Sequence, residues 1–272
     1  MQIIPQFTVD TFSECLFQGD PTCVCLLEKW LPDELMLAIA QENNLPETAF
    51  IIPKEDTFGL RWFTPLKEIE LCGHATLAAA FVIQQTTKNP PEIIQFHTLS
   101  GTLTVRAQHD WLFMNFPIYD LRQVPITESL VKMLGIAPQE VYLGRDLVCI
   151  LKDEKQIQQF NPNYNNLLQL DGLLLHITAK GTKYDCISRS FAPKLAVNES
   201  HACASGHCHI FPYWAKRLEK TRLTGYQASS RGGVLHATIH KDHIVLGGKA
   251  VLFAKSELYL PESAVKTPAN LY

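Results

Sequence analysis

The sequence predicts an α+β fold made of two related halves, each a mostly antiparallel sheet curled around one central helix. One observation is a repeated phrase, which reads Phe63-Thr64-Pro65 then Cys72-Gly73-His74, and later Phe191-Ala192-Pro193 then Cys203-Ala204-Ser205. In each copy an apolar stretch follows the cysteine, and a glycine-led strand comes after it. The repeat length of about 130 residues is too long for one unit of a solenoid and indicates a duplicated domain.

The second observation is the order of the elements, because strand-rich segments flank each helix instead of alternating with helices one by one. In the first half we expect strands at 2–12, 22–27, 48–52 and 58–63, helices at about 31–43 and 74–86, and further strands up to Pro117. Pro32 and the two acids after it suit a helix start. The helix at 74–86 is apolar almost all round, so it should be enclosed.

The second half repeats this order. We expect a helix at 128–135, strands around 140–152, 172–179 and 183–190, a helix at about 204–218 and two hairpins at the end. The polar segment 118–128 contains Pro125 and is a predicted linker. The halves are then residues 1–117 and 118–272, with the C-terminal strand free to return to the first half. Two related halves commonly hold a site in the cleft between them.

Composition excludes several classes of function. The 272 residues are 46% hydrophobic and 19% charged, as in an ordinary globular protein. A net charge of −3 and the lack of a long basic run argue against nucleic-acid and membrane-surface partners. The N-terminus lacks a signal-peptide pattern, and no apolar run has transmembrane length. The eight cysteines lack the density of a disulfide scaffold. We therefore expect a soluble cytoplasmic protein.

The two cysteine-to-helix junctions are candidate binding sites. Backbone N–H groups at a helix start, together with the helix dipole, bind a carboxylate or stabilise an enolate-like charge. We expect Gly73 and Ala75 to contribute such contacts at the first junction, and Ser205 and Gly206 at the second. The alternative is ordinary N-capping of the second helix by Ser200 or Ser205.

Glu47 is a candidate acid/base group. It follows a helix stop and precedes the apolar run at 48–52, so it can be drawn inward, where desolvation raises a carboxyl pKa. The alternative is a solvated glutamate beside a turn, which is the commoner fate of this residue type.

Cys72 and Cys203 are alternative catalytic candidates. Each precedes a helix, where the dipole lowers a thiol pKa, and one thiol from each half could remove and return a proton. The alternative is a buried apolar cysteine. A further cluster consists of His201, Cys203, His207, Cys208 and His209. Its spacing does not match a structural zinc site, and neighbours on a helix point in different directions, so we expect no metal.

Several segments of the chain together resemble one family. They are Val9 to Phe12, Phe17 to Pro21, Asn44 to Phe50, Arg61 to Leu77, Arg189 to Pro193, and Gln227 to Gly233. The chain is thereby identified as similar to the phenazine biosynthesis PhzF-like isomerases, within the diaminopimelate epimerase-like fold superfamily. The resemblance implies two pseudo-symmetric halves, no cofactor and a homodimer. It also implies that Glu47 is the acid/base glutamate and that His74 assists it.

The second junction departs from the family pattern Glu-Asp-Pro-Val-Thr-Gly-Ser-Ala. The chain reads Glu199 to Gly206 there, with Ser200 in place of the aspartate that orients substrate and Ala204 in place of the glycine. The same run is similar to the second cysteine motif of diaminopimelate epimerase.

Three hypotheses follow for the function. The leading one is a cofactor-independent isomerase that moves a proton on a small carboxylic acid, with Glu47 and His74 as catalytic residues and Gly73, Ala75, Ser200, Ser205 and Gly206 as substrate-binding residues. The alternatives are a racemase or epimerase that uses Cys72 and Cys203, and a non-catalytic small-molecule binding protein.

Overall fold

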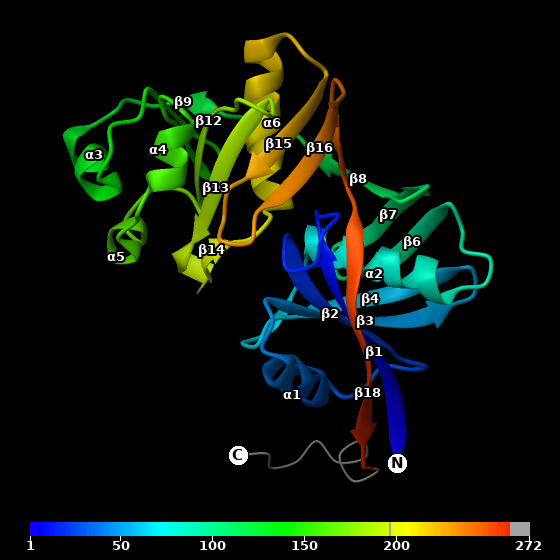
Figure 1. The fold of residues 1–272 in the computed structure, drawn as a ribbon. Coiled ribbons are helices and arrows are strands. Elements are labelled where there is room, and N and C mark those ends of the chain that lie inside the picture. Colours follow the sequence, from blue (N-terminus) through cyan, green and yellow to red (C-terminus); the bar gives the residue numbers. More distant parts are fainter. Residues whose placement is uncertain (196, 262–272) are drawn as a thin grey trace. The chain divides into compact units, whose positions relative to one another are not determined.

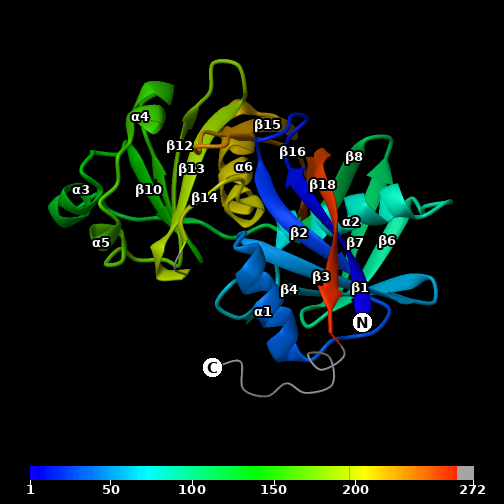
Figure 2. The same ribbon diagram turned by 60° about the horizontal axis from the view of Figure 1, so that its bottom comes forward.

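The structure, a computed structural model, describes residues 1–195 and 197–261. Contacts divide the chain into two units, of which unit 1 comprises Met1–Met114 with the chain from Gly248, and unit 2 comprises Asn115–Gly247 (Figure 1). The chain returns to unit 1 because its last strand, β18 (Ala250–Leu260), pairs antiparallel with β1 (Gln2–Thr11). Figure 2 shows these two strands side by side. Of the half expected at 118–272, residues 196 and 262–272 lie outside the described residues.

Unit 1 is one curled sheet with two helices. Besides β1 and β18 it contains β2 (Asp20–Leu26), α1 (Asp33–Asn43), β3 (Glu47–Lys54), β4 (Thr57–Phe63), β5 (Glu68–Ile69), α2 (Gly73–Thr86), β6 (Ile93–Thr98), β7 (Gly101–Gln108) and the start of β8 (Trp111–Pro117). The strands pair in the order β18-β1-β2-β3-β4-β6-β7-β8, with β5 added to β4.

Helix α2 is enclosed by this sheet, as the sequence predicted. Its contacts include β1, β2, β3, β7 and β18, and Figure 1 shows it among the strands of unit 1. Leu77, Val82 and three consecutive alanines between them have no exposed surface. A helix with apolar residues on every side must be surrounded, and small alanines let strands approach it closely. By contrast, α1 buries only one face, centred on Met36 and Ile39.

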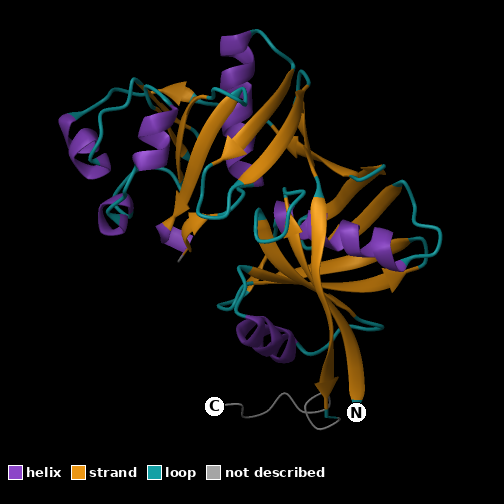
Figure 3. Cartoon of the chain, in the orientation of Figure 1, coloured by secondary structure: helices purple, strands orange, loops and turns teal. Residues whose placement is uncertain are grey.

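Unit 2 repeats the plan with additional short helices (Figure 3). It contains β9 (Arg122–Gln123), α3 (Glu128–Leu134), β10 (Glu140–Leu143), β11 (Leu147–Ile150), α4 (Glu154–Gln159), α5 (Tyr164–Leu167), β12 (Leu175–Lys180), β13 (Cys186–Ala192), the 3₁₀ helix η1 (Pro193–Leu195), β14 (Val197–Ser200), α6 (Ala204–Leu218), β15 (Arg222–Gln227), β16 (Gly233–Ile239) and β17 (His243–Gly248). The expected linker at 118–128 includes β9, which pairs with β10.

The two sheets share the same sequence of pairings. In unit 1 the pairs β2–β3 and β4–β6 are parallel, and in unit 2 the corresponding pairs β11–β12 and β13–β15 are parallel. The pairings between and after them are antiparallel in both units. The duplication expected from the repeated phrase is therefore present in the strand topology. Among the described helices, none is both long enough and apolar enough to span a bilayer.

Candidate active site

The first junction leads directly into α2. Cys72 is the N-cap residue in extended conformation, and the first turn has no side-chain cap hydrogen bond within the described chain. Thr76 donates both its N–H and its hydroxyl to the Cys72 carbonyl, at 3.0 and 2.6 Å. The start of α2, at Gly73, thus retains the positive end of the helix dipole, as a site for a carboxylate requires.

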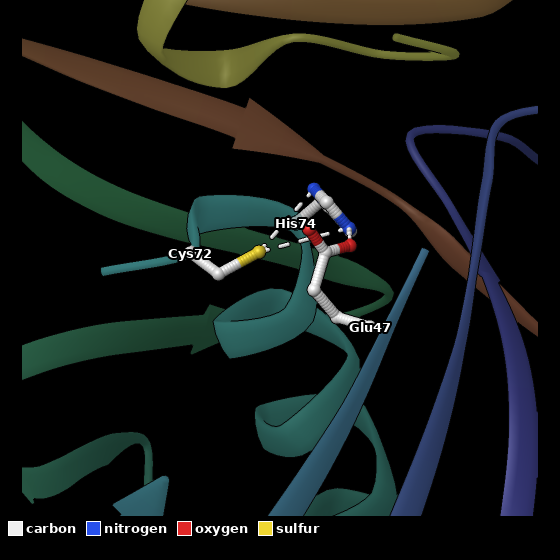
Figure 4. Close-up of side chains that lie close together, drawn as sticks. All are labelled: Glu47, Cys72 and His74. Atoms are coloured by element: carbon white, nitrogen blue, oxygen red, sulfur yellow. Dashed lines mark hydrogen bonds and ion pairs between the residues drawn. The ribbon is translucent and has the colours of Figure 1, made fainter. Parts of the chain in front are cut away.

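Glu47 lies at the start of β3 and reaches this helix start. Its Oε2 is 2.6 Å from Nε2 of His74, and each side chain is only 13% exposed (Figure 4). Of the two positions considered for Glu47, the structure therefore has the inward one, and not the solvated one that is commoner for this residue type. A carboxylate and an imidazole at this distance form a charge-assisted hydrogen bond in which the ring N–H donates.

The electrostatic surroundings keep His74 charged. Burial by itself lowers the His74 pKa, but the nearby carboxylates of Asp20 and Glu47, together with the Cys72 thiol, raise it well above its ordinary value. The Asp20 carboxylate Oδ2 is 3.7 Å from Nδ1 of His74. His74 is thus an imidazolium between two acidic side chains.

Cys72 is the third side chain in Figure 4. Its Sγ lies 3.5 Å from Nδ1 and 3.7 Å from Nε2 of His74. Burial raises the pKa of the Cys72 thiol, and the Glu47 carboxylate raises it further, while His74 acts in the opposite direction. Cys72 therefore remains a neutral thiol near neutral pH.

These three side chains also resemble a set of metal ligands, since their ligand atoms lie within 4.8 Å of one another. Nitrogen and oxygen ligands about 2.1 Å from a tetrahedral zinc are separated by roughly 3.4 Å. The 2.6 Å between His74 and Glu47 is shorter and is a hydrogen-bond distance. The observed arrangement is that of an acid–base pair.

The second junction leads into α6 and is capped differently. The Cys203 thiol accepts the Gly206 N–H at 3.3 Å, so the alternative in which Ser200 or Ser205 caps this helix is not what the structure has. The Cys203 N–H donates to Oε1 of Gln227, and the Gln227 amide donates to the Ser200 carbonyl. Burial raises the Cys203 pKa, although contacts with Ser205 and Gly206 lower it. The sulfur thus caps the helix as a neutral thiol.

Sequence reasoning did not find the charged network behind this junction. The Asp146 carboxylate has no exposed surface and accepts two hydrogen bonds from Arg145, at 3.0 and 2.5 Å, and one from His176 at 3.0 Å. Nδ1 of His176 lies 2.9 Å from the Ser190 hydroxyl. Burial alone would raise the Asp146 pKa, but His176 and Arg145 hold it well below its usual range. The signal in the sequence was an Arg-Asp pair directly before the apolar strand β11.

Arg145 connects this network to Ser205. Its Nη2 donates to the Ser205 hydroxyl at 3.1 Å, and its guanidinium lies 4.8 Å from the centre of the Tyr119 ring. The other predicted residue here, Gly206, has a packing role, because a Cβ at this position would lie 2.5 Å from the His176 ring. The absence of that Cβ lets the buried imidazole approach α6.

The histidines of α6 belong to the interior. His207 contacts the Ser188 hydroxyl and the Cys203 carbonyl, and burial lowers its pKa to about 4. His209 stacks on Tyr119 with ring centres 4.4 Å apart, and burial lowers its pKa to about 4 as well. Among the described residues of unit 2, one group has atoms close enough to share a metal, from Asp146, His176 and His209. Both ring nitrogens of His176 are already hydrogen-bonded.

The structure therefore groups the predicted residues in two sets. Glu47, Cys72, Gly73, His74 and Ala75 lie together at the start of α2. Cys203, Ser205 and Gly206 lie at the start of α6, and Ser200 is linked to them through Gln227. A cavity of about 800 Å³ at the other end of α2, beside Ile83 and Thr86, includes none of these residues.

Comparison with known proteins gives a consistent result. An uncharacterized isomerase of Pseudomonas aeruginosa is 41% identical over 254 residues, covering 93% of this chain and 98% of the relative. The crystal structure of a PhzF family protein from Enterococcus faecalis has 43% identity and a TM-score of 0.93, covering 95% of this chain and 100% of that one. A predicted epimerase of Pseudomonas aeruginosa has a TM-score of 0.71 at 16% identity, with coverage of 95% and 100%, and shows likeness of fold alone.

These similarities define an enzyme of the isomerase class with the α+β, diaminopimelate epimerase-like fold that the sequence predicted. The pattern of one family, described as phenazine biosynthesis-like protein (PhzC-PhzF), matches residues 9–256. The chain belongs to this family.

Proposed function

We propose that the protein is a cofactor-independent isomerase that moves a proton on a small carboxylic acid. The observation that carries the proposal is the 2.6 Å hydrogen bond between Glu47 and His74 at the start of α2. A general base must lie within hydrogen-bond reach of the proton that it removes, and its partner must favour the charge that develops. Glu47 and His74 supply these two roles side by side.

The side chains of this site account for both the removal and the return of the proton. The Glu47 carboxylate takes the proton as a substrate C–H bond breaks, and the electron pair passes into the adjoining π system of the acid. The positive charge of His74 and the N–H groups at Gly73 and Ala75 stabilise the resulting anion. Glu47 then returns the proton to a different carbon, which completes the isomerisation without net oxidation or reduction.

The second junction supports recognition of the acid. Ser205 lies at the start of α6 next to the cationic Arg145. A hydroxyl and a helix start suit a carboxylate or another anionic group. We therefore retain Ser205 as a substrate-binding residue, with Ser200 and Gly206 beside it, and from the family resemblance we also propose a homodimer, which sedimentation can test.

The two-thiol hypothesis finds less support. It requires a thiolate at Cys72 or Cys203, and burial raises the pKa of both thiols. A thiol whose pKa is raised by burial forms little thiolate and reacts poorly. A Cys203→Ser variant should accordingly retain proton exchange, and its complete loss in a variant that still melts like the wild type would favour the two-thiol mechanism.

Deuterium incorporation tests the proposal without a known substrate. A panel of small hydroxy, amino and unsaturated carboxylic acids is incubated with the protein in D₂O and followed by NMR. We expect incorporation into at least one acid by the wild type, and its loss in Glu47→Gln. Glu42→Gln is the matched control because Glu42 is exposed on α1. Exchange that persists in Glu47→Gln would overturn the assignment of the base.

A further inference from the structure

Asp20 is a buried carboxylate on the side of His74 that faces away from Glu47. Its side chain is only 3% exposed, and its Oδ2 lies 3.7 Å from Nδ1 of His74. The other ring nitrogen, Nε2, is hydrogen-bonded to Glu47. Each nitrogen of the imidazole therefore faces its own carboxylate, and the two carboxylates come from neighbouring strands.

The backbone fixes Asp20 in this place. Asp20 is the first residue of β2 and pairs with Thr11, whose hydroxyl donates to the Asp20 carbonyl at 3.0 Å. The preceding Gly19 has φ +71°, and a Cβ there would lie 1.9 Å from the Thr11 carbonyl oxygen. In the parallel pair β2–β3, Thr22 is the register partner of Glu47. The carboxylates of Asp20 and Glu47 are thus held by rigid strands.

We propose that Asp20 is a positioning residue, which keeps His74 in its charged form and directs the Nε2 proton to Glu47. The mechanistic consequence rests on the proposed function, in which Glu47 accepts a proton. The coupling of Asp20 to His74 follows from their geometry alone.

The role of Asp20 becomes important during proton transfer. Among the described residues of unit 1, the charged or titratable groups that face His74 are Asp20 from β2, Glu47 from β3 and Cys72 from the end of the loop before α2. When Glu47 takes the substrate proton, it loses its negative charge and no longer stabilises the His74 imidazolium. Burial still disfavours that positive charge. Asp20 still carries its charge at that moment. It therefore holds the positive charge on His74 while the substrate anion exists.

NMR titration of the His74 ring tests the coupling directly. The resonances are assigned with His74→Gln, and the ring is followed from pH 5 to 9 in the wild type and in Asp20→Asn. We expect His74 to stay protonated through neutral pH in the wild type, as its raised pKa indicates. In Asp20→Asn the midpoint should fall by about 1 pH unit or more, because an opposite charge within 4 to 6 Å has an effect of that size.

Asp10→Asn is the matched control. Asp10 is likewise buried, at 2% exposure in β1, and its Oδ2 accepts the Phe17 N–H at 2.8 Å. We expect a smaller shift of the His74 midpoint in this variant, while Asp20→Glu, which keeps the charge, should retain a raised midpoint. Equal shifts in Asp10→Asn and Asp20→Asn would overturn the proposal. So would a wild-type midpoint at or below the ordinary value of about 6.5, even if Asp20→Asn failed to fold.

Proton exchange separates this role from a merely structural one. Asp20→Asn should have a reduced kcat near neutral pH with little change in KM, and its activity should recover as the pH falls below the lowered midpoint. A pH-independent loss would contradict the positioning role. If the His74 midpoint shifts as expected but Glu47→Gln retains exchange, the proposed function fails while the coupling of Asp20 and His74 stands.

Discussion

The starts of α2 and α6 occupy corresponding places in the two units, which the strand register makes explicit. Phe63 of β4 pairs with Thr48 of β3, and Phe191 of β13 pairs with Leu175 of β12. Glu47 therefore corresponds to Leu174, which has no acid/base group. Counting from the two cysteines, His74 corresponds to Ser205. The Glu47–His74 pair of unit 1 therefore has no equivalent at the corresponding described positions of unit 2.

Unit 2 has its own carboxylate, but at another position. In the parallel pairs, Cys23 of β2 lies opposite Thr48, and Leu147 of β11 lies opposite Leu175. Cys23 therefore corresponds to Leu147, and the residue before it, Thr22, corresponds to Asp146. Asp146 is fully buried and hydrogen-bonded to Arg145 and His176, whereas Glu47 is 13% exposed. A carboxylate at the equivalent level on the neighbouring strand is therefore enclosed as an ion-pair partner, whereas Glu47 on β3 stays partly accessible.

Removing the buried charge in unit 2 should have the largest effect on stability. Asp146→Ala leaves Arg145 and His176 without their partner, and breaking a buried ion pair costs about 3 to 5 kcal/mol. Denaturant unfolding measures this loss, with Glu47→Gln as the contrasting variant in unit 1. A loss below about 1 kcal/mol would mean that the network contributes little to the fold.

Gly206→Ala should destabilise unit 2 less, by about 1 to 3 kcal/mol, because the new Cβ would overlap the His176 ring. The residues of unit 1 that correspond to Gly206 and His176 are Ala75 and Ala49, which are both fully buried. A double variant that also changes His176 to Ala should therefore cost less than the sum of its two single changes. Strict additivity in denaturant unfolding would contradict this coupling.

The pH dependence of stability should show opposite contributions from the two units. His207 and His209 have pKa values of about 4 when folded, so the unfolded chain binds more protons below about pH 6.5. Their stabilising contribution is present above that pH and falls by about 1.4 kcal/mol per proton per pH unit on acidification. His74 has a raised pKa, so its contribution is full below about pH 6.5 and is lost as the pH rises through the folded value.

Urea titrations between pH 4 and 8 measure the acid limb of this dependence. His209→Gln should make the decline towards pH 4 shallower, since one of the two buried neutral histidines is gone. An unchanged slope would show that His209 is not held neutral in the folded protein.

Local sequence patterns predicted the parts of the site that depend on nearby residues. The start of α2 follows from the cysteine-to-helix phrase and the apolar run after it, and the position of Glu47 follows from the family resemblance. The interactions of Asp20 with His74, and of Asp146 with His176, join residues from strands and helices far apart in the sequence. They depend on strand register, which residue spacing does not reveal.

Two short helices were missed by the sequence analysis for a different reason. Helices α4 and α5 have only 6 and 4 residues, too few for a periodic pattern, and each is capped by the side chain before it, Asp153 or Asn163. The cap of α6 was also missed, because a cysteine is an uncommon cap and Ser205 stood next to it.

The most direct test measures deuterium exchange and melting on the same preparation of Glu47→Gln. We predict that exchange into an acid accepted by the wild type falls at least 100-fold, the usual scale for loss of a general base, while Tm stays within about 2 °C of the wild type. Wild-type exchange in the folded variant would contradict the central claim that Glu47, hydrogen-bonded to His74 at the start of α2, transfers the proton.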